Sequence, residues 1–478
     1  MPERADSAAT AASPFGAGTS DGAPSADAAR LVIATIRTMD PAHPLAEAML
    51  VVGDRIAAVG PLDSVRAAAP AGTLEERLEG VVLPGFIDAH AHAQRAGLKA
   101  MQLTEPGTDA EGFLAAMLSD GDADPDAPDW LGDEPPTIDD RVAAIRRVQP
   151  LLHELGFTGV VDPAVTLEEL AGYREAHRLG ALSMRVVAMP YPELGTERTP
   201  DVDAALAMLA GIDGATGDGD DLLRLGPIKV YYDGEGMKGQ ALLERPWTGD
   251  DHGVQRISAA GFARLAAACI RSGWGLGVHA VGSRAVAEVL DAFEAAGSPA
   301  EVEPLRCQLI HAYLEPSAES MARAARLGVI ASLQPSIVWN NAAGLAVRLG
   351  ERMERVGPVR AWLDAGATVA LGSDAPYFPF DPRHLVAMAA DRRMRGVAEP
   401  VGADQAITVL EGVEAYTRGA ARASLAEGDR GELRAGLLAD WVLLDVDPGS
   451  CSSAEFRAAR VLRTVGGGRE VFRASGDS

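Results

Sequence analysis

The stretch PGFIDAHAH, residues 84–92, places two histidines directly behind a short apolar run. Because side chains at positions i and i+2 of a strand point to the same side, His90 and His92 can offer two imidazoles to one metal ion. Taken alone, such a pair is equally consistent with two ordinary polar residues at a strand end. Its meaning therefore depends on the residues that come later in the chain.

Four further ionisable residues stand at the ends of apolar, strand-like runs: Lys229 in GPIKVYYDG, His279 in GVHAVG, His311 in LIHAY and Asp374 in ALGSDAP. Eight such runs alternate with helical stretches, at 81–91, 158–164, 183–190, 225–232, 273–281, 306–314, 328–335 and 367–375. This alternation indicates a parallel sheet covered by helices, and eight units predict an α/β fold of the (β/α)8 TIM-barrel type. Such a barrel gathers its catalytic groups at the carboxyl ends of the strands. We therefore expect all six residues on one face.

Both ends of the chain indicate a small β structure. Short β-type runs at 30–38, 46–52 and 55–59 precede the barrel, and similar runs return near the end of the chain. We expect a composite β-sandwich of residues 30–80 and 426–478 around a barrel of residues 81–425. Residues 1–29, rich in Ala, Ser, Gly and Asp, are expected to form a disordered tail without the features of a signal peptide. The Asp- and Pro-rich segment 117–140 is expected to be a loop, either a lid or a solvated acidic insertion.

Composition restricts the partners. Lys+Arg 43 against Asp+Glu 68 gives a formal net charge of −25, which argues against nucleic acids and anionic membrane surfaces. The three cysteines are scattered without a CxxC, and no apolar run approaches the ~20 residues of a membrane span, so we expect a cytoplasmic protein. Only three lysines occur, so Lys229 inside an apolar strand requires an explanation of its own.

Together these motifs resemble the metal-dependent amidohydrolase superfamily, in particular amidohydrolase family 3, which includes N-substituted formamide deformylases. The similarity covers residues 30–478. Besides PGFIDAHAH, its blocks are HAVGSRAV (279–286), RLGVIASLQP (326–335), DAGATVALGSDAP (364–376), AYTRGAARA (415–423) and GELRAGLLADWVLLD (431–445). Two positions depart from the family pattern. Ser283 replaces an Asp, and Ile310 to Tyr313 replace a Glu-His-Ala-Gln block.

The resemblance implies a divalent metal centre, most often with two zinc ions. His90, His92 and Asp374 would hold the more buried ion, and His279 and His311 would hold the second. Lys229 would be carboxylated by carbon dioxide, so that its carbamate bridges both ions. An anionic carbamate suits zinc, whereas an ammonium would be repelled by nearby cations. The alternative for Lys229 is a strand-end lysine paired with an acidic residue, Asp233 or Glu235.

The resemblance and the ligand set predict metal-dependent hydrolysis of a non-peptide C–N bond by metal-activated hydroxide. The bond would belong to a small-molecule amide, such as an N-formyl, N-acyl or cyclic amide, and Asp374 would carry the proton to the leaving nitrogen. Candidate substrate contacts are the aromatic residues just past strand ends, Tyr232, Trp339 and Tyr377. The remaining histidines, His43, His153, His177, His252 and His384, are expected to have ordinary structural or surface roles.

Two alternatives belong to other functional classes. In a mononuclear deaminase of a heterocycle, Lys229 would be structural, but HAVGSRAV lacks the carboxylic acid that would protonate a ring nitrogen. In a non-catalytic amidohydrolase-like scaffold, the metal ligands would typically be missing, whereas all six positions are present here. The oligomeric state stays open between monomer and homodimer.

Overall fold

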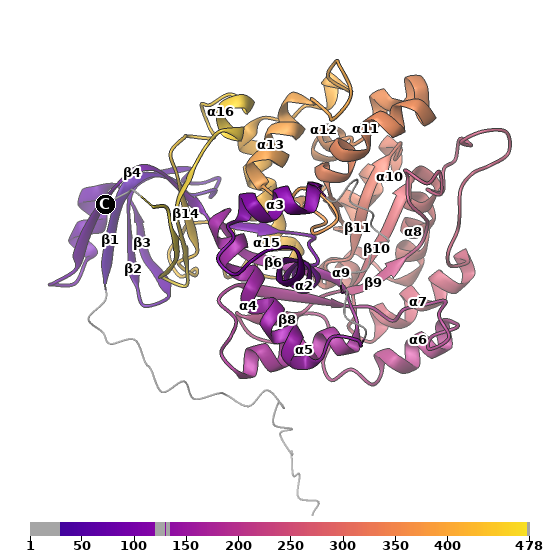
Figure 1. Ribbon diagram of the computed structural model, residues 1–478, viewed down its shortest axis with the longest axis horizontal. Coiled ribbons are helices and arrows are strands. Elements are labelled where there is room, and N and C mark those ends of the chain that lie inside the picture. Colours follow the sequence, from indigo (N-terminus) through magenta and orange to yellow (C-terminus); the bar gives the residue numbers. More distant parts are fainter. Residues whose placement is uncertain (1–28, 120–129, 131–133, 476–478) are drawn as a thin grey trace, which may run out of the picture.

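The computed structural model describes residues 29–119, 130 and 134–475. Figure 1 shows a β structure, built from the indigo N-terminal and yellow C-terminal segments, beside a larger body of strands and helices. The predicted tail, residues 1–29, lies outside the described residues except for Ala29. That residue is buried against the first strands, so it belongs to the folded part of the chain.

The two chain ends meet in one seven-stranded sheet with the order β16-β15-β14-β4-β1-β2-β3. Its strands are β1 Arg30–Arg37, β2 Leu45–Val52, β3 Arg55–Gly60, β4 Leu74–Pro84, β14 Trp441–Leu444, β15 Val461–Gly466 and β16 Arg469–Arg473, and helix α1 (Leu62–Ala68) lies against β2. Strand β14 pairs antiparallel with β4, so that Trp441 lies opposite Pro84. Both chain ends therefore contribute strands to one sheet, and the composite β-sandwich stays a prediction.

Two parallel sheets form the larger body. One contains β5 Phe86–Asp88, β6 Phe157–Val165, β7 Arg185–Pro190 and β8 Leu223–Leu225; the other contains β9 Ile228–Tyr231, β10 Leu276–Gly282, β11 Gln308–Leu314, β12 Ile330–Leu333 and β13 Val369–Leu371. Each of the eight predicted runs contains a strand. The fourth is split into β8 and β9 at Gly226-Pro227, where proline lacks the N–H that a strand ladder needs.

Backbone hydrogen bonds join the first and last of these strands. The Ala89 N–H donates to the Leu371 carbonyl at 3.1 Å, just past the end of β5, and the Asp374 N–H donates to the His90 carbonyl at 2.7 Å. The close approach requires a glycine, because a Cβ at Gly372 would lie 2.6 Å from the backbone nitrogen of His90. The segment after β5 is thereby held against the segment after β13.

Besides α1, the described residues form further helices, most of which follow the parallel strands. They are α2 Ala93–Leu103, α3 Ala110–Ser119, α4 Ile138–Glu154, α5 Leu167–Arg178, α6 Val202–Leu209, α7 Ala259–Arg271, α8 Ser283–Ala296, α9 Pro299–Val302, α10 Ala318–Leu327, α11 Pro335–Leu349, α12 Val359–Asp364, α13 Pro382–Asp391, α14 Val409–Glu414, α15 Ala420–Ala423 and α16 Ser453–Arg457. Short 3₁₀ or π segments are η1 Glu303–Leu305, η2 Gly350–Arg355, η3 Ala403–Gln405 and η4 Ala415–Gly419. In α10 the buried residues Met321, Ala324 and Leu327 share one face, as expected of a helix that covers a sheet.

The predicted loop 117–140 is helical at both ends. Residues 117–119 belong to α3 and residues 138–140 to α4, which begins at a capping box formed by Thr137 and Asp140. The Asp- and Pro-rich composition concealed these ends because a capping box uses polar residues of the same kind. Residues 120–129 and 131–133 lie outside the described residues, so a lid stays a prediction. No helix in the described ranges is both long and apolar enough to span a membrane.

Candidate metal centre

Two histidines and an aspartate converge where β5 and β13 end. The Nε2 atoms of His90 and His92 lie 3.5 and 3.3 Å from Oδ1 of Asp374, and one donor atom from each residue lies within 4.8 Å of the others. All three side chains are buried. Asp374 has a φ of 59°, a left-handed conformation that is uncommon for non-glycine residues and that concentrates at functional sites.

The other three predicted ligands continue this cluster across β9, β10 and β11. The rings of His279 and His311 are 4.6 Å apart between centroids, and the His311 ring is 5.1 Å from that of His90. Lys229 is 1% exposed, and its Nζ lies 4.9 Å from the centroid of the Tyr231 ring. The Tyr231 ring is in turn 5.1 Å from His279. The structure therefore brings all six residues into one buried cluster.

The electrostatics of the cluster suit a divalent cation. Burial, followed by the charge of Lys229, lowers the pKa of His90 to about 3 and holds the pKa of His279 well below its usual value. Burial opposes the charge of Asp374, but hydrogen bonds from His90 and His92 keep the pKa of Asp374 well below its usual value. The site thus offers neutral imidazoles and an ionised carboxylate, which are the metal-binding forms.

Unsatisfied ring nitrogens give an independent test of the fit. Within the described residues, Nδ1 of His90, Nδ1 of His311 and both ring nitrogens of His279 are buried without a well-oriented hydrogen-bond partner. Buried polar atoms normally have partners, so several unpartnered imidazole nitrogens in one cluster point to a bound species that nitrogen atoms can coordinate. A divalent metal fits this donor set.

Two carboxylates that the sequence analysis missed lie behind the histidines. Asp88 accepts hydrogen bonds from the backbone N–H groups of His90 and Ser373, both at 3.0 Å, and burial raises its pKa to about 7. Asp162, at the end of the apolar run in β6, has Oδ1 3.9 Å from Nδ1 of His92, and burial raises its pKa to about 6. Asp88 thus fixes the backbone beside the ligands, whereas Asp162 is the carboxylate placed to act on the His92 imidazole through its charge. Their signal in the sequence was an aspartate inside an otherwise apolar strand.

Asp233, one of the two acidic residues considered as a partner of Lys229, has another role. Asp233 accepts hydrogen bonds from the backbone N–H groups of Leu242, Val281 and Gly282, each at 2.9 Å, and so holds the loop after β9. Burial lowers the pKa of Lys229 to about 7, although the charges of Asp374 and Glu235 act in the opposite direction. At neutral pH a substantial fraction of this amine is therefore uncharged, and the uncharged amine is the form that reacts with carbon dioxide.

The two tyrosines at the end of β9 point to opposite sides. Tyr232 packs its ring against Phe262, 5.2 Å away, and its hydroxyl contacts Glu288, so it lies among the covering helices. This placement is at odds with the predicted substrate contact. Tyr231, two residues after Lys229 and therefore on the same side of the strand, lies beside His279 and 5.4 Å from the ring of Tyr191. Strand periodicity from Lys229 could have identified it.

The other two predicted substrate contacts differ in position. The ring of Tyr377 is 5.3 Å from that of His92, at the edge of the cluster. Trp339 lies farther out, 4.7 Å from the ring of His384 and 6.0 Å from the guanidinium carbon of Arg395.

Other histidines bond to ordinary partners. His153 contacts the Phe157 carbonyl and the Ser183 hydroxyl, each at 2.9 Å. His177 pairs with Asp220, His252 with the Leu243 carbonyl, and His43 with Asp40.

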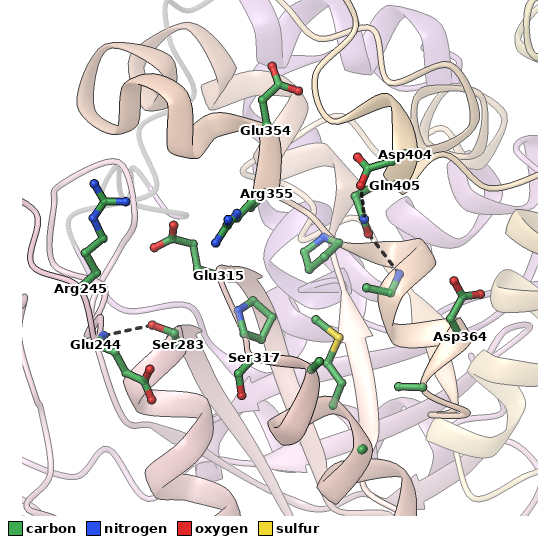
Figure 2. Close-up of a pocket in the computed structure, with 17 residues that line it drawn as sticks. Glu244, Arg245, Ser283, Glu315, Ser317, Glu354, Arg355, Asp364, Asp404 and Gln405 are labelled. Atoms are coloured by element: carbon green, nitrogen blue, oxygen red, sulfur yellow. Dashed lines mark hydrogen bonds between the residues drawn. The ribbon is translucent and has the colours of Figure 1, made fainter.

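A cavity of about 480 Å³ is lined by the loop after β9, by helix α11 and by the segment after β13, and none of the six ligands is among its described lining residues. Its lining includes Glu235, whose charge acts on Lys229, and Phe378, four residues after Asp374. A larger cavity of about 770 Å³, shown in Figure 2, lies between the starts of α8 and α10 and the end of α12, and none of the six ligands is among its described lining residues. Ser283 faces this second cavity and accepts a hydrogen bond from the Glu244 backbone N–H at 3.1 Å. The departure at Ser283 therefore lies away from the metal ligands.

Comparison with known families gives a direct assignment. The sequence pattern of the Amidohydrolase family matches residues 108–472, which is most of the chain. The chain belongs to the amidohydrolase family. A second pattern, an imidazolonepropionase-like composite domain of bacteria, matches residues 48–71 within the seven-stranded sheet. The N-substituted formamide deformylase of Arthrobacter pascens is 26% identical over 91% of this chain and 96% of its own length. The protein is thus a metal-dependent hydrolase of C–N bonds other than peptide bonds.

Solved structures agree on the fold. An uncharacterised metal-dependent hydrolase from Pyrococcus furiosus superposes with a TM-score of 0.69 at 22% identity, covering 88% of this chain and 99% of that one. Atrazine chlorohydrolase TrzN from Arthrobacter aurescens TC1, crystallised with zinc, gives a TM-score of 0.60 at 19% identity and covers 94% and 97%. At these identities the likeness shows the architecture of the amidohydrolase superfamily rather than a shared substrate.

Proposed function

We propose that this enzyme hydrolyses a non-peptide amide, of the N-formyl, N-acyl or cyclic kind, into a carboxylate and an amine. The observation that carries the proposal is the convergence of His90, His92 and Asp374 within 4.8 Å at the joined ends of β5 and β13. Membership in the amidohydrolase family supports the same chemistry, and the deformylase relative suggests an acyl group as small as formyl.

We infer a centre of two zinc ions, one held by His90, His92 and Asp374 and the other by His279 and His311. A carbamate on Lys229 would join the two halves, and the burial of this lysine next to His279 and Tyr231 supports that role. When bound, such ions polarise a carbonyl group and lower the pKa of water towards ~7. The zinc in one structural neighbour is consistent with this choice of metal.

Asp374 is the side chain proposed to transfer the proton of the attacking water. Oδ1 of Asp374 is within 3.5 Å of both His90 and His92, so the carboxylate is fixed in direction at the mouth of the cluster. From there an oxygen of Asp374 takes the proton of the attacking water and delivers it to the leaving nitrogen, serving as base and then as acid. Tyr231 and Tyr377 flank the cluster on two sides and limit the space open to the acyl group.

We further propose that the two parallel sheets close into one eight-stranded barrel of residues 81–425. The hydrogen bonds between the segments after β5 and β13 support closure on one side, and the direct passage from β8 to β9 supports it on the other. The seven-stranded sheet would fold over a shared core as a composite sandwich of residues 30–80 and 426–478. Val32, Val82 and Trp441, from both chain ends, pack in one buried cluster and support this arrangement.

The test is a substrate screen with zinc-loaded enzyme. N-formyl amines, N-acetyl amines, cyclic amides and ureas are incubated with the wild-type protein, and carboxylate and amine release are measured separately. We expect equimolar release of both products from at least one amide. The Asp374→Asn variant should lose about a hundredfold in turnover, the scale of general acid–base catalysis. Ammonia release from a heterocycle with no carboxylate formed would overturn the proposal in favour of a deaminase.

A further inference from the structure

The lining of the 480 Å³ cavity has a net charge opposite in sign to that of the whole molecule. The chain carries a formal net charge of −25. The 480 Å³ cavity is nevertheless lined by two cations, Lys238 and Arg395, against one carboxylate, Glu235. The larger cavity of Figure 2 has five carboxylates (Glu244, Glu315, Glu354, Asp364 and Asp404) against two arginines, as the rest of the surface would lead one to expect.

A third cation, Arg256, lies on the tyrosine ring that contacts two of the proposed metal ligands. Its guanidinium carbon is 5.8 Å from the centroid of the Tyr231 ring, whose other contacts are Lys229 and His279. Burial raises the pKa of Glu235, which lines the cavity, and the charges of Arg256 and Lys238 oppose this shift. We call Lys238, Arg256 and Arg395 the basic rim.

The backbone fixes the loop that carries Arg256. The Arg256 N–H donates to the Tyr232 carbonyl at 2.8 Å, and Asp233 and Gln255 form an antiparallel bridge. Arg256 is therefore held beside the end of β9 although its side chain is exposed. A guanidinium on the face of an aromatic ring keeps its N–H groups available for a carboxylate.

We propose that the preferred substrates are amides whose amine half carries a carboxylate, such as N-acyl amino acids, with that carboxylate bound at the basic rim. Met237 and Phe378 line the same cavity and would receive an apolar side chain of the amine half. A volume of about 480 Å³ is within the range of small-molecule sites. Local positive charge in an acidic protein also concentrates anions at the mouth. The inference rests on the proposed amide hydrolysis and names its substrate class.

The experiment compares two formamides that differ by one carboxylate. N-formylphenylalanine and N-formylphenethylamine are assayed by formate release with wild-type enzyme and with Lys238→Gln, Arg256→Gln and Arg395→Gln. The wild type should show the higher kcat/KM for the acid. Each variant should raise the KM for the acid, by about tenfold for Arg256→Gln as expected for loss of a charge-assisted hydrogen bond, and leave the KM for the neutral amide within twofold. Arg264→Gln, an exposed arginine on α7, is the matched control.

Two results would overturn the inference: equal kcat/KM of the wild type for both formamides, or an equal rise of both KM values in the Arg256→Gln variant. A proposed function that fails leaves a different signature, because wild-type enzyme would then release formate from neither compound. In that case the dissociation constants of both formamides are measured by calorimetry with the Asp374→Asn protein. The basic rim is supported if the Asp374→Asn protein binds the acid more tightly than the neutral amide and if the Asp374→Asn/Arg256→Gln double variant does not. Equal binding of the two compounds to the Asp374→Asn protein rejects it.

Discussion

The two halves of the metal-ligand cluster are built differently. His90, His92 and Asp374 come from neighbouring segments, share contacts of 3.3 and 3.5 Å, and include an ionised carboxylate. His279 and His311 come from adjacent strands and contact each other through their rings, without a ligand carboxylate of their own. The first half therefore contains an anionic ligand of its own. In the proposed two-ion centre the second half would need an anion, and a carbamate on the buried Lys229 would supply it.

The loss of a ligand from the first half should have the largest effect. His90→Ala removes a contact with Asp374 and a neighbour of His311, so turnover should fall by about a thousandfold or more, since metal activation of water is lost. In elemental analysis, His311→Ala should retain about one equivalent of zinc per chain. His90→Ala should retain less than His311→Ala, because the first half has lost a ligand. His177→Ala, a surface histidine paired with Asp220, is the control. Equal metal loss in both ligand variants would remove the distinction between the halves.

Changing the bridging residue should have the next largest effect. Lys229→Ala deletes the proposed anionic link, and we expect turnover to fall by about a hundredfold or more, with zinc content reduced mainly in the second half. Added formate or propionate should restore part of the activity by occupying the vacated position. Rescue by the uncharged analogue formamide to the same extent would contradict an anionic bridge.

Removal of the carboxylate behind His92 should weaken zinc binding in the first half only. In Asp162→Asn the side chain keeps its size but loses the charge that lies 3.9 Å from Nδ1 of His92. We expect a 10- to 100-fold loss of zinc affinity or activity, as is typical when a residue that orients an imidazole ligand is changed. Competition with a zinc indicator measures the affinity, and Asp220→Asn on the surface is the control. Weaker zinc binding in the second half alone would be inconsistent with this role.

Metal removal should give the smallest of the expected effects, a modest difference in zinc affinity between the two halves. Dialysis against chelators of increasing strength should release the ions in two steps, with the ion of the second half leaving first. The two dissociation constants should differ by about tenfold, or ~1.4 kcal/mol, because one extra ionised ligand favours the first half. In the Asp374→Asn variant the two release steps should move closer together, because the first half loses its extra ionised ligand. Release of both ions in one step would contradict a difference in affinity between the halves and would indicate that the bridging group couples the two ions.

The sequence was sufficient for the strands and for the six-residue cluster, because each ligand follows a run of apolar residues whose direction a parallel sheet determines. It failed where the direction of a single side chain mattered. The position of Tyr232 just past a strand end predicts a substrate contact, but the two-residue period of a strand places Tyr231, and not Tyr232, on the side of Lys229. Trp339 was chosen for its position after a strand, but contacts beyond the strand end place it against His384.

Long-range support was also hidden from the sequence. Asp88 connects the segments after β5 and β13 through Ser373, which is 285 residues away in the chain. Periodicity within one strand carries no information about such a partner. The opposite charge of the two cavities was equally hidden, because the members of the basic rim come from separate loops. Composition alone, at −25, indicates the opposite sign.

The place of β14 in the sheet has a consequence for synthesis. Strand β4 ends at Pro84 and pairs on one side with β14, which starts at Trp441, 441 − 84 = 357 residues later. At roughly 5 to 20 residues per second, a ribosome needs about 20 to 70 s to make that stretch. During this time one edge of β4 is open to other strands. A nascent chain that stalls before residue 441 therefore displays the backbone leading directly to His90, and we expect chaperones that shield unpaired edges to bind it there.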